Sequence, residues 1–192
     1  MKVNEYFDRV VVINLDRRPD RMEILGPQLD KLGIQYERFS AIDNKERGIS
    51  PVLAGKLSHV EVLKGQNGHK VLILEDDAHF VDGFNEKFSR VTETLPWNWD
   101  IFYLGVLLGT TGKLERYNNH WHRQVVSTGT QAYCVNPNKV DYFIEKQLEW
   151  DGFVDVCYRV LASETNAYVT QPNLVTQFPS YSDLREREVD DF

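Results

Sequence analysis

Short apolar runs of strand length alternate with segments of helical spacing along most of this chain. Residues 10–15, 71–74 and 100–105 are rich in β-branched, aliphatic and aromatic side chains, as in strands that are buried on both faces of a sheet. Residues 19–32 and 51–64 instead space their apolar side chains as one face of a helix does. This alternation predicts an α/β fold with a mixed, mostly parallel sheet flanked by helices.

Three segments are less regular than this pattern. Gly26 and Pro27 interrupt the first helical segment, so we expect a kink or two short helices there. Residues 110–123 are polar and predict an exposed hairpin or loop. The chain of 192 residues has the length of one domain, which we place at residues 1–183, and residues 184–192 are expected to form a charged C-terminal tail.

Composition excludes several classes of protein. There are 22 Lys and Arg residues against 29 Asp and Glu residues, a net charge of −7, so a broad nucleic-acid interface is not expected. No run approaches the ~20 apolar residues of a transmembrane segment, and the polar N-terminus does not resemble a signal peptide. With only two cysteines, we expect buried free thiols and a cytoplasmic protein, and peripheral attachment to a membrane stays open.

Three consecutive acids directly follow the most apolar strand candidate, residues 71–74. If the strand continues, Glu75 and Asp77 point to one side of the sheet and Asp76 to the other. Two carboxylates at a strand end are ligands that Mg²⁺ or Mn²⁺ uses while it also holds substrate phosphates. The alternative is a solvated acidic turn without a ligand.

Arginines cluster after the first strand candidate, beside the helix start at Pro19. The guanidinium groups of Arg17 and Arg21, together with helix N-terminal amides, suit a diphosphate. The alternative is an exposed helix start at which these arginines pair with Asp16 and Asp20.

Two further pairs of residues are candidates for chemistry. Asp151 and Asp155 lie at a helix start, where a carboxylate either complements the helix dipole or serves as a general base. Ser58 and His59 are adjacent on a helix, where side chains diverge by about 100°, so they do not form a Ser-His nucleophile pair. A hydrogen-bonded histidine is the simpler interpretation.

Eight segments, taken in order along nearly the whole chain, resemble glycosyltransferase family 25. That family includes bacterial lipopolysaccharide galactosyltransferases and collagen galactosyltransferases. The matching segments are residues 12–21, 36–43, 54–59, 71–78, 99–105, 128–133, 154–156 and 172–177.

The resemblance implies a GT-A-like fold, a UDP-galactose or UDP-glucose donor, Mn²⁺ (or Mg²⁺) and an inverting reaction. It places Glu75 and Asp77 at the outer positions of a DxD-like motif as metal ligands. The resemblance leaves the third protein ligand open, with Gln177 as the first candidate and His79 as the second. It also implies a set of donor-binding residues, which comprises Ile13, Asn14, Leu15, Arg17, Arg21, Ser58, His59, Asp76, Gly129 and Thr130.

The expected reaction is the transfer of a hexose to a hydroxyl group, with Asp155 as the general base and Asp151 as the second candidate. The acceptor is a glycan, a lipid-linked oligosaccharide, the lipopolysaccharide core during its biosynthesis, or a protein hydroxyl. One alternative is an inactive protein of this fold that binds a nucleotide sugar or a glycan. A metal-dependent phosphoryl or nucleotidyl transferase and a glycosidase are further alternatives.

Overall fold

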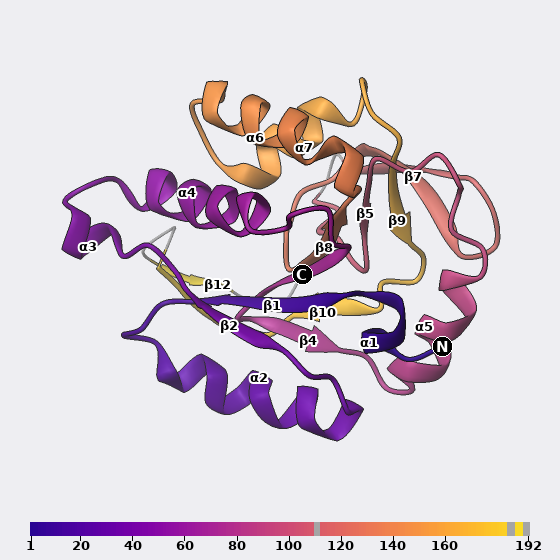
Figure 1. The fold of residues 1–192 in the computed structure, drawn as a ribbon, viewed down its shortest axis with the longest axis horizontal. Coiled ribbons are helices and arrows are strands. Elements are labelled where there is room, and N and C mark those ends of the chain that lie inside the picture. The colour runs from indigo at the N-terminus through magenta and orange to yellow at the C-terminus, as the bar shows by residue number, and fades with distance from the viewer. Residues whose placement is uncertain (110–111, 184–186, 190–192) are drawn as a thin grey trace.

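A twisted sheet of eight strands organises the chain, whose computed structural model describes residues 1–109, 112–183 and 187–189 (Figure 1). The strand order is β2-β1-β3-β8-β5-β9-β7-β6. Their bounds are β1 (Arg9–Asn14), β2 (Glu37–Ser40), β3 (Val71–Glu75), β5 (Ile101–Tyr103), β6 (Lys113–Arg116), β7 (Trp121–Val126), β8 (Ala132–Val135) and β9 (Ala167–Thr170).

The sheet is mixed, and most of its strands run in one direction. Strand β1 is parallel to β2 and β3, and β5 is parallel to β9. Strand β8 lies antiparallel between β3 and β5, and β7 lies antiparallel between β9 and β6. The predicted fold class, an α/β domain with a mixed, mostly parallel sheet flanked by helices, is confirmed.

Helices cover both faces of the sheet. In Figure 1, α4, α6 and α7 lie above it, and α1, α2 and α5 lie below it. Their bounds, with those of the short α3 and of a 3₁₀ turn η1, are α1 (Val3–Tyr6), α2 (Pro19–Leu32), α3 (Asn44–Arg47), α4 (Pro51–Lys64), α5 (Phe84–Thr92), η1 (Pro137–Lys139), α6 (Val140–Glu149) and α7 (Val154–Leu161).

The sheet divides the core into two apolar layers. Val10 and Val12 of β1 pack in the layer of α2 and α5, and Val11 and Ile13 pack in the layer of α4, α6 and α7. This division follows from the alternation of side chains along a strand. Two small antiparallel pairs complete the fold: β4 (Ala78–Phe80) with β10 (Val175–Gln177), and β11 (Ser180–Ser182) with β12 (Arg187–Val189).

The first helical segment forms one helix, so the prediction of two short helices is wrong, and the alternative of a kink stays a prediction. Helix α2 is a single helix of 14 residues with Pro27 inside it, so two short helices are not formed. Proline removes one backbone hydrogen bond, but Leu25 and Leu29, which flank it, are fully buried and hold the helix against the sheet. The polar segment predicted as a hairpin or loop contains the β6–β7 hairpin, and residues 110–111 lie outside the described residues.

The predicted tail is described only in part. Residues 187–189 form β12, and residues 184–186 and 190–192 lie outside the described residues. The domain boundary at residue 183 stays a prediction. Among the helices that the structure describes, none is both long enough and apolar enough to cross a membrane.

Candidate active site

An open cleft lies beyond the ends of β1 and β3. Its wall is built from the ends of these strands, from α4, from residues 128–130, from the start of α7 and from the late segment around residues 177–183. The position fits the general rule that ligands of α/β sheets bind beyond the carboxyl ends of the strands. Lining residues that the sequence had singled out include Ile13, Leu15, Glu75, Asp77, Gly129, Asp155 and Gln177.

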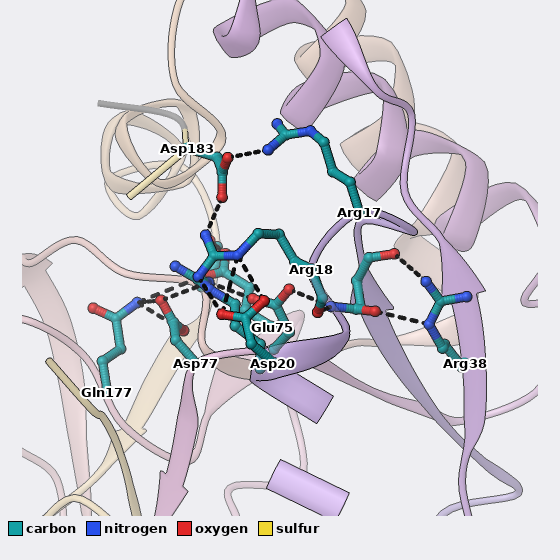
Figure 2. Close-up of polar contacts among 12 residues, drawn as sticks. Arg17, Arg18, Asp20, Arg38, Glu75, Asp77, Gln177 and Asp183 are labelled. Carbon is teal, nitrogen blue, oxygen red and sulfur yellow. Dashed lines mark hydrogen bonds and ion pairs between the residues drawn. The ribbon is translucent and has the colours of Figure 1, made fainter. Parts of the chain in front are cut away.

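The structure brings Glu75, Asp77 and Gln177 together. The Gln177 amide nitrogen lies 3.3 Å from Asp77 Oδ1 and 3.4 Å from Glu75 Oε2. Strand β10 causes this approach because it pairs with β4, directly after the acids, and sets Gln177 opposite Ala78. Figure 2 shows Gln177 and Asp77 side by side.

Asp76 lines the cleft together with the other two acids but has additional partners of its own. Strand β3 ends at Glu75, so Asp76 and Asp77 lie in a turn and the alternation expected for a continued strand does not apply to them. Its carboxylate accepts a hydrogen bond of 2.7 Å from the Asn14 amide and forms an ion pair with Arg21. Burial raises the pKa of Asp76, although Arg21 and Asn14 act in the opposite direction. Arg21, expected at the diphosphate, is therefore paired with this buried acid, and a second contact of 3.7 Å joins it to Asp77.

Asn14 is not among the residues that line the cleft, whereas Ile13 and Leu15 on either side of it are. It is buried, and its side chain donates to Asp76 and to the backbone oxygen of Arg18 while it accepts from Arg38. The Asn14 side chain therefore supports Asp76 from the side opposite to that of Ile13 and Leu15, and its role in nucleotide binding stays a prediction.

The two acids at the cleft titrate differently. Burial, followed by the neighbouring charge of Glu75, raises the pKa of Asp77 to about 8. Burial would raise the pKa of Glu75 as well, but contacts with His59 and Thr130 hold it below its ordinary value. Both side chains are half-buried, and a pair of neighbouring carboxylates with one raised pKa is a common feature of functional sites.

The two carboxylates at this place fit a hard divalent cation, and Gln177, whose amide nitrogen faces them here, would add an oxygen ligand only with its amide group turned round. Carboxylate and amide oxygens are ligands of Mg²⁺ and Mn²⁺, which commonly keep water and substrate phosphates as further ligands. Within the described part of the chain, no group of three His, Cys, Asp and Glu residues could hold a metal ion by itself. Glu75, Asp77 and the Gln177 amide would therefore need phosphate or water to complete a metal site.

Ser58 and His59 line the cleft from α4, and each has a defined set of contacts. The Ser58 hydroxyl accepts from the Ile42 amide at 2.9 Å and donates to the Ala54 carbonyl at 2.9 Å, so it attaches the segment after β2 to the helix. The His59 ring lies with Nδ1 2.8 Å from the Tyr133 hydroxyl and Nε2 3.4 Å from Glu75 Oε1. The interpretation of His59 as a hydrogen-bonded histidine agrees with these contacts.

Asp183 is a site residue that the sequence analysis missed. Its carboxylate lines the cleft and pairs with both Arg17 and Arg18, as Figure 2 shows. Arg17 also pairs with Asp43 at 2.7 Å, and Arg18 with Asp20 at 2.8 Å. Arg17 thus faces acidic partners in this structure. No sequence signal marks Asp183, because it lies 166 residues from Arg17.

The two candidate bases separate clearly. Asp155, in the first turn of α7, lines the cleft, and its Oδ2 accepts a hydrogen bond of 3.2 Å from the Gly129 amide. Gly129 has a φ of 95°, a conformation that favours glycine. Asp151 is exposed and is not among the lining residues. Thr130 donates its hydroxyl to Glu75, so residues 129 and 130 connect the two acidic parts of the cleft.

Several known glycosyltransferases are similar to this chain in sequence. A mimivirus glycosyltransferase, from Acanthamoeba polyphaga mimivirus, is 29% identical over 70% of this chain and 46% of its own length. Mouse procollagen galactosyltransferase 2 is 26% identical over 52% of this chain and 21% of its own length. The chain is related to glycosyltransferase 25 family members. The resemblance inferred from the sequence is thereby confirmed.

A further relative carries the family name and is described as inactive. The human inactive glycosyltransferase 25 family member 3 is 30% identical over 52% of this chain and 22% of its own length. The chain therefore spans less than half of the length of each of these relatives. No protein-family model matches it. A solved structure of UDP-glucose pyrophosphorylase with UDP-glucose aligns with 85% of this chain and 72% of its own, at 10% identity and a TM-score of 0.47.

Proposed function

We propose that this chain is a metal-dependent, inverting glycosyltransferase that moves a hexose, galactose or glucose, from a UDP-sugar to a hydroxyl group. The observation that carries the proposal is the cleft itself. This chain is related to glycosyltransferase 25 family members, and its cleft holds a half-buried acid pair beside Gln177 and a separate carboxylate, Asp155.

The lining supports a nucleotide-sugar donor. The wall of the cleft combines the apolar residues Ile13, Leu15, Ile42 and Val52 with the acid pair, a lining that suits a nucleobase together with a diphosphate. Arg17 and Arg18 are cations beside the N-terminus of α2, where a diphosphate would compete with the Asp183 carboxylate for their guanidinium groups.

The residues of the cleft then have separate tasks. Glu75, Asp77 and Gln177 would hold Mn²⁺ or Mg²⁺, which supplies charge stabilisation for the diphosphate leaving group. Asp155 accepts the proton of the acceptor hydroxyl while that oxygen attacks the anomeric carbon from the face opposite UDP. The Gly129 amide holds the Asp155 carboxylate in place for this step.

The acceptor belongs to one of the classes named from the sequence: a glycan, a lipid-linked oligosaccharide, the lipopolysaccharide core or a protein hydroxyl. The name of the mouse relative favours galactose as the sugar. A cytoplasmic location is part of this proposal.

A second candidate function is binding of a nucleotide sugar or a glycan without turnover. One observation favours it, because a human relative at similar identity is named inactive. The intact acid pair, Asp155 and the arginines support activity instead.

The test is the release of UDP by the purified protein with Mn²⁺, measured separately for UDP-galactose, UDP-glucose and UDP-N-acetylglucosamine. We expect slow, metal-dependent release from one donor and its loss in Asp77→Ala. UDP binding by calorimetry without any release would favour the second candidate. If the protein neither releases UDP from any donor nor binds UDP in the presence of Mn²⁺, the nucleotide-sugar proposal is refuted.

A further inference from the structure

One carboxylate of the cleft, that of Asp183, belongs to a cluster of ion pairs. The other members of this cluster are Arg17, Arg18, Asp20 and Asp43. Asp183 lines the cleft, whereas the other four are not among the lining residues. The two arginines therefore lie behind the carboxylate as seen from the cleft, and Figure 2 shows both of them directed towards it.

Each oxygen of the Asp183 carboxylate is held by a different guanidinium group. Arg17 Nη1 donates to Oδ1, and Arg18 Nη1 donates to Oδ2. The arginines are themselves fixed on their other sides. Arg17 Nε donates to Asp43 at 2.7 Å, and Arg18 donates to Asp20 through Nε at 3.0 Å and Nη2 at 2.8 Å. The carboxylate is therefore held in one orientation in the wall of the cleft.

The charges of this cluster limit the ligands that it can accept. Two arginines face three carboxylates, so the cluster has two positive and three negative charges, a net charge of −1. A diphosphate would meet the Asp183 carboxylate before it reached a guanidinium group, and like charges repel. A metal ion at Asp183 would have to displace two charge-assisted hydrogen bonds. An uncharged hydrogen-bond donor faces neither obstacle.

The Asp183 carboxylate can accept further hydrogen bonds. Burial alone would raise the pKa of Asp183, but the hydrogen bonds from Arg17 and Arg18 hold it below its ordinary value, so the group is ionised at neutral pH. An ionised carboxylate has about four acceptor positions, two on each oxygen. Within the described part of the chain, the two arginine contacts are its hydrogen bonds, so each oxygen keeps one position. Two adjacent hydroxyl groups of a sugar match such a pair of oxygens.

The chain around Asp183 places it close to the acid pair. The Phe178 amide donates to the Asp77 carbonyl at 3.0 Å, and Gln177, Phe178 and Asp183 all line the cleft. In a nucleotide sugar, the ribose and the hexose are bonded to the two ends of the diphosphate, and both carry adjacent hydroxyl groups. A carboxylate that binds a ribose hydroxyl is a common feature of nucleotide-binding α/β folds.

We propose that Asp183, held by Arg17 and Arg18, is a binding residue that accepts hydrogen bonds from two adjacent hydroxyl groups of the nucleotide sugar. The two arginines then serve to orient this carboxylate, and they stay paired with it when the diphosphate binds. The proposal deepens the proposed function and rests on it for the nature of the ligand.

The first test compares ligands that differ by one hydroxyl group, using the native protein and calorimetry with Mn²⁺. The ribose arm compares UDP with 2′-deoxy-UDP and 3′-deoxy-UDP, and the hexose arm compares UDP-galactose and UDP-glucose with their monodeoxy analogues. We expect a loss of affinity of about 10- to 100-fold at two adjacent positions of one sugar, the usual effect of removing a hydrogen bond to a charged group. Losses below about 3-fold at every position would overturn the proposal without any variant.

The second test asks whether Asp183 is the group that receives these hydroxyls. Asp183→Asn removes the charge and keeps the shape, so we expect the cost of the missing hydroxyl to fall to about 3-fold or less. Asp43→Asn is the matched control, because it removes the same charge from the same cluster outside the lining, and asparagine can still cap α3 as Asp43 does. It should keep the native cost, with thermal unfolding measured for both variants.

Two results of the second test would overturn the proposal. One is an unchanged cost of the missing hydroxyl in Asp183→Asn. The other is tighter binding of UDP by Asp183→Asn than by Asp43→Asn, which would mean that Asp183 competes with the diphosphate for the arginines. If the native protein binds neither UDP nor a UDP-sugar, the proposed function fails and this proposal fails with it. Nucleotide binding without discrimination between hydroxyls refutes this proposal alone.

Discussion

Two aspartates, Asp151 and Asp155, are four residues apart and have different surroundings. Asp155 lines the cleft and is held by the Gly129 amide, and Asp151 is exposed outside the lining. We expect Asp155→Asn to lower kcat by about 10²- to 10⁴-fold, the usual effect of losing a general base. Asp151→Asn makes the same change of charge and serves as the control. Equal activities of the two variants, with unchanged UDP binding, would exclude Asp155 as the base.

The raised pKa of Asp77 predicts a pH-dependent stability of the metal-free protein. Its carboxyl titrates near pH 8 in the folded state and near its ordinary value of 3.8 when unfolded. Between these values the folded state binds the additional proton, so the free energy of unfolding falls as the pH rises towards 8. Asp77→Asn cannot ionise, and its stability should fall less over this range.

Urea unfolding in the presence of a chelator measures this difference. We expect Asp77→Asn to become more stable than the native protein as the pH approaches 8. The addition of Mn²⁺ should then stabilise the native protein and leave Asp77→Asn unchanged, because a ligand stabilises the state to which it binds. Parallel pH profiles for the two proteins would show that Asp77 ionises normally.

Among the elements, β10 is held in place where its backbone passes close to Leu104 and Gly105. The backbone amides of Leu174 and Val175 donate to the Leu104 carbonyl, and a Cβ at Gly105 would lie 1.8 Å from the Val175 carbonyl oxygen. Gly105→Ala should therefore move β10 or destabilise the protein by about 1–3 kcal/mol. Since β10 includes Gln177, UDP and Mn²⁺ binding should weaken as well.

Gly109→Ala is the control for this variant, because a Cβ there meets no atom within 4 Å. Chemical unfolding and calorimetry of both variants check the prediction. If Gly105→Ala keeps the stability and the ligand affinity of Gly109→Ala, the close approach does not hold β10 in place.

The same elements show how far the sequence predicts this fold. Strands such as β3 have at least four consecutive apolar residues, a signal strong enough to detect. The three-residue strands β4 and β10 contain too few residues for a periodic pattern, so the position of Gln177 beside Asp77 could be expected only from the family resemblance. The alternation expected for a continued strand does not apply to Asp76, because β3 ends at Glu75. The partners of Arg17 and Arg21 depend on contacts across the fold.

At the scale of the whole molecule, the sheet couples two core layers. Alternate residues of β1 belong to different layers, and so a loss of order in one layer removes packing from the other. Phe88 of α5 is fully buried in one layer and Phe143 of α6 in the other. We expect Phe88→Ala and Phe143→Ala each to cost about 3–5 kcal/mol, a large part of the stability of a domain of this size.

Both variants should still unfold in a single transition that is the same by tryptophan fluorescence and by far-ultraviolet circular dichroism. The reason is that neither layer has a sheet of its own. Two separate transitions in either variant would mean that one layer remains folded without the other. The wall of the cleft combines α4 and α7 above the sheet with the ends of β1 and β3. In that case one layer alone would be sufficient to form this wall.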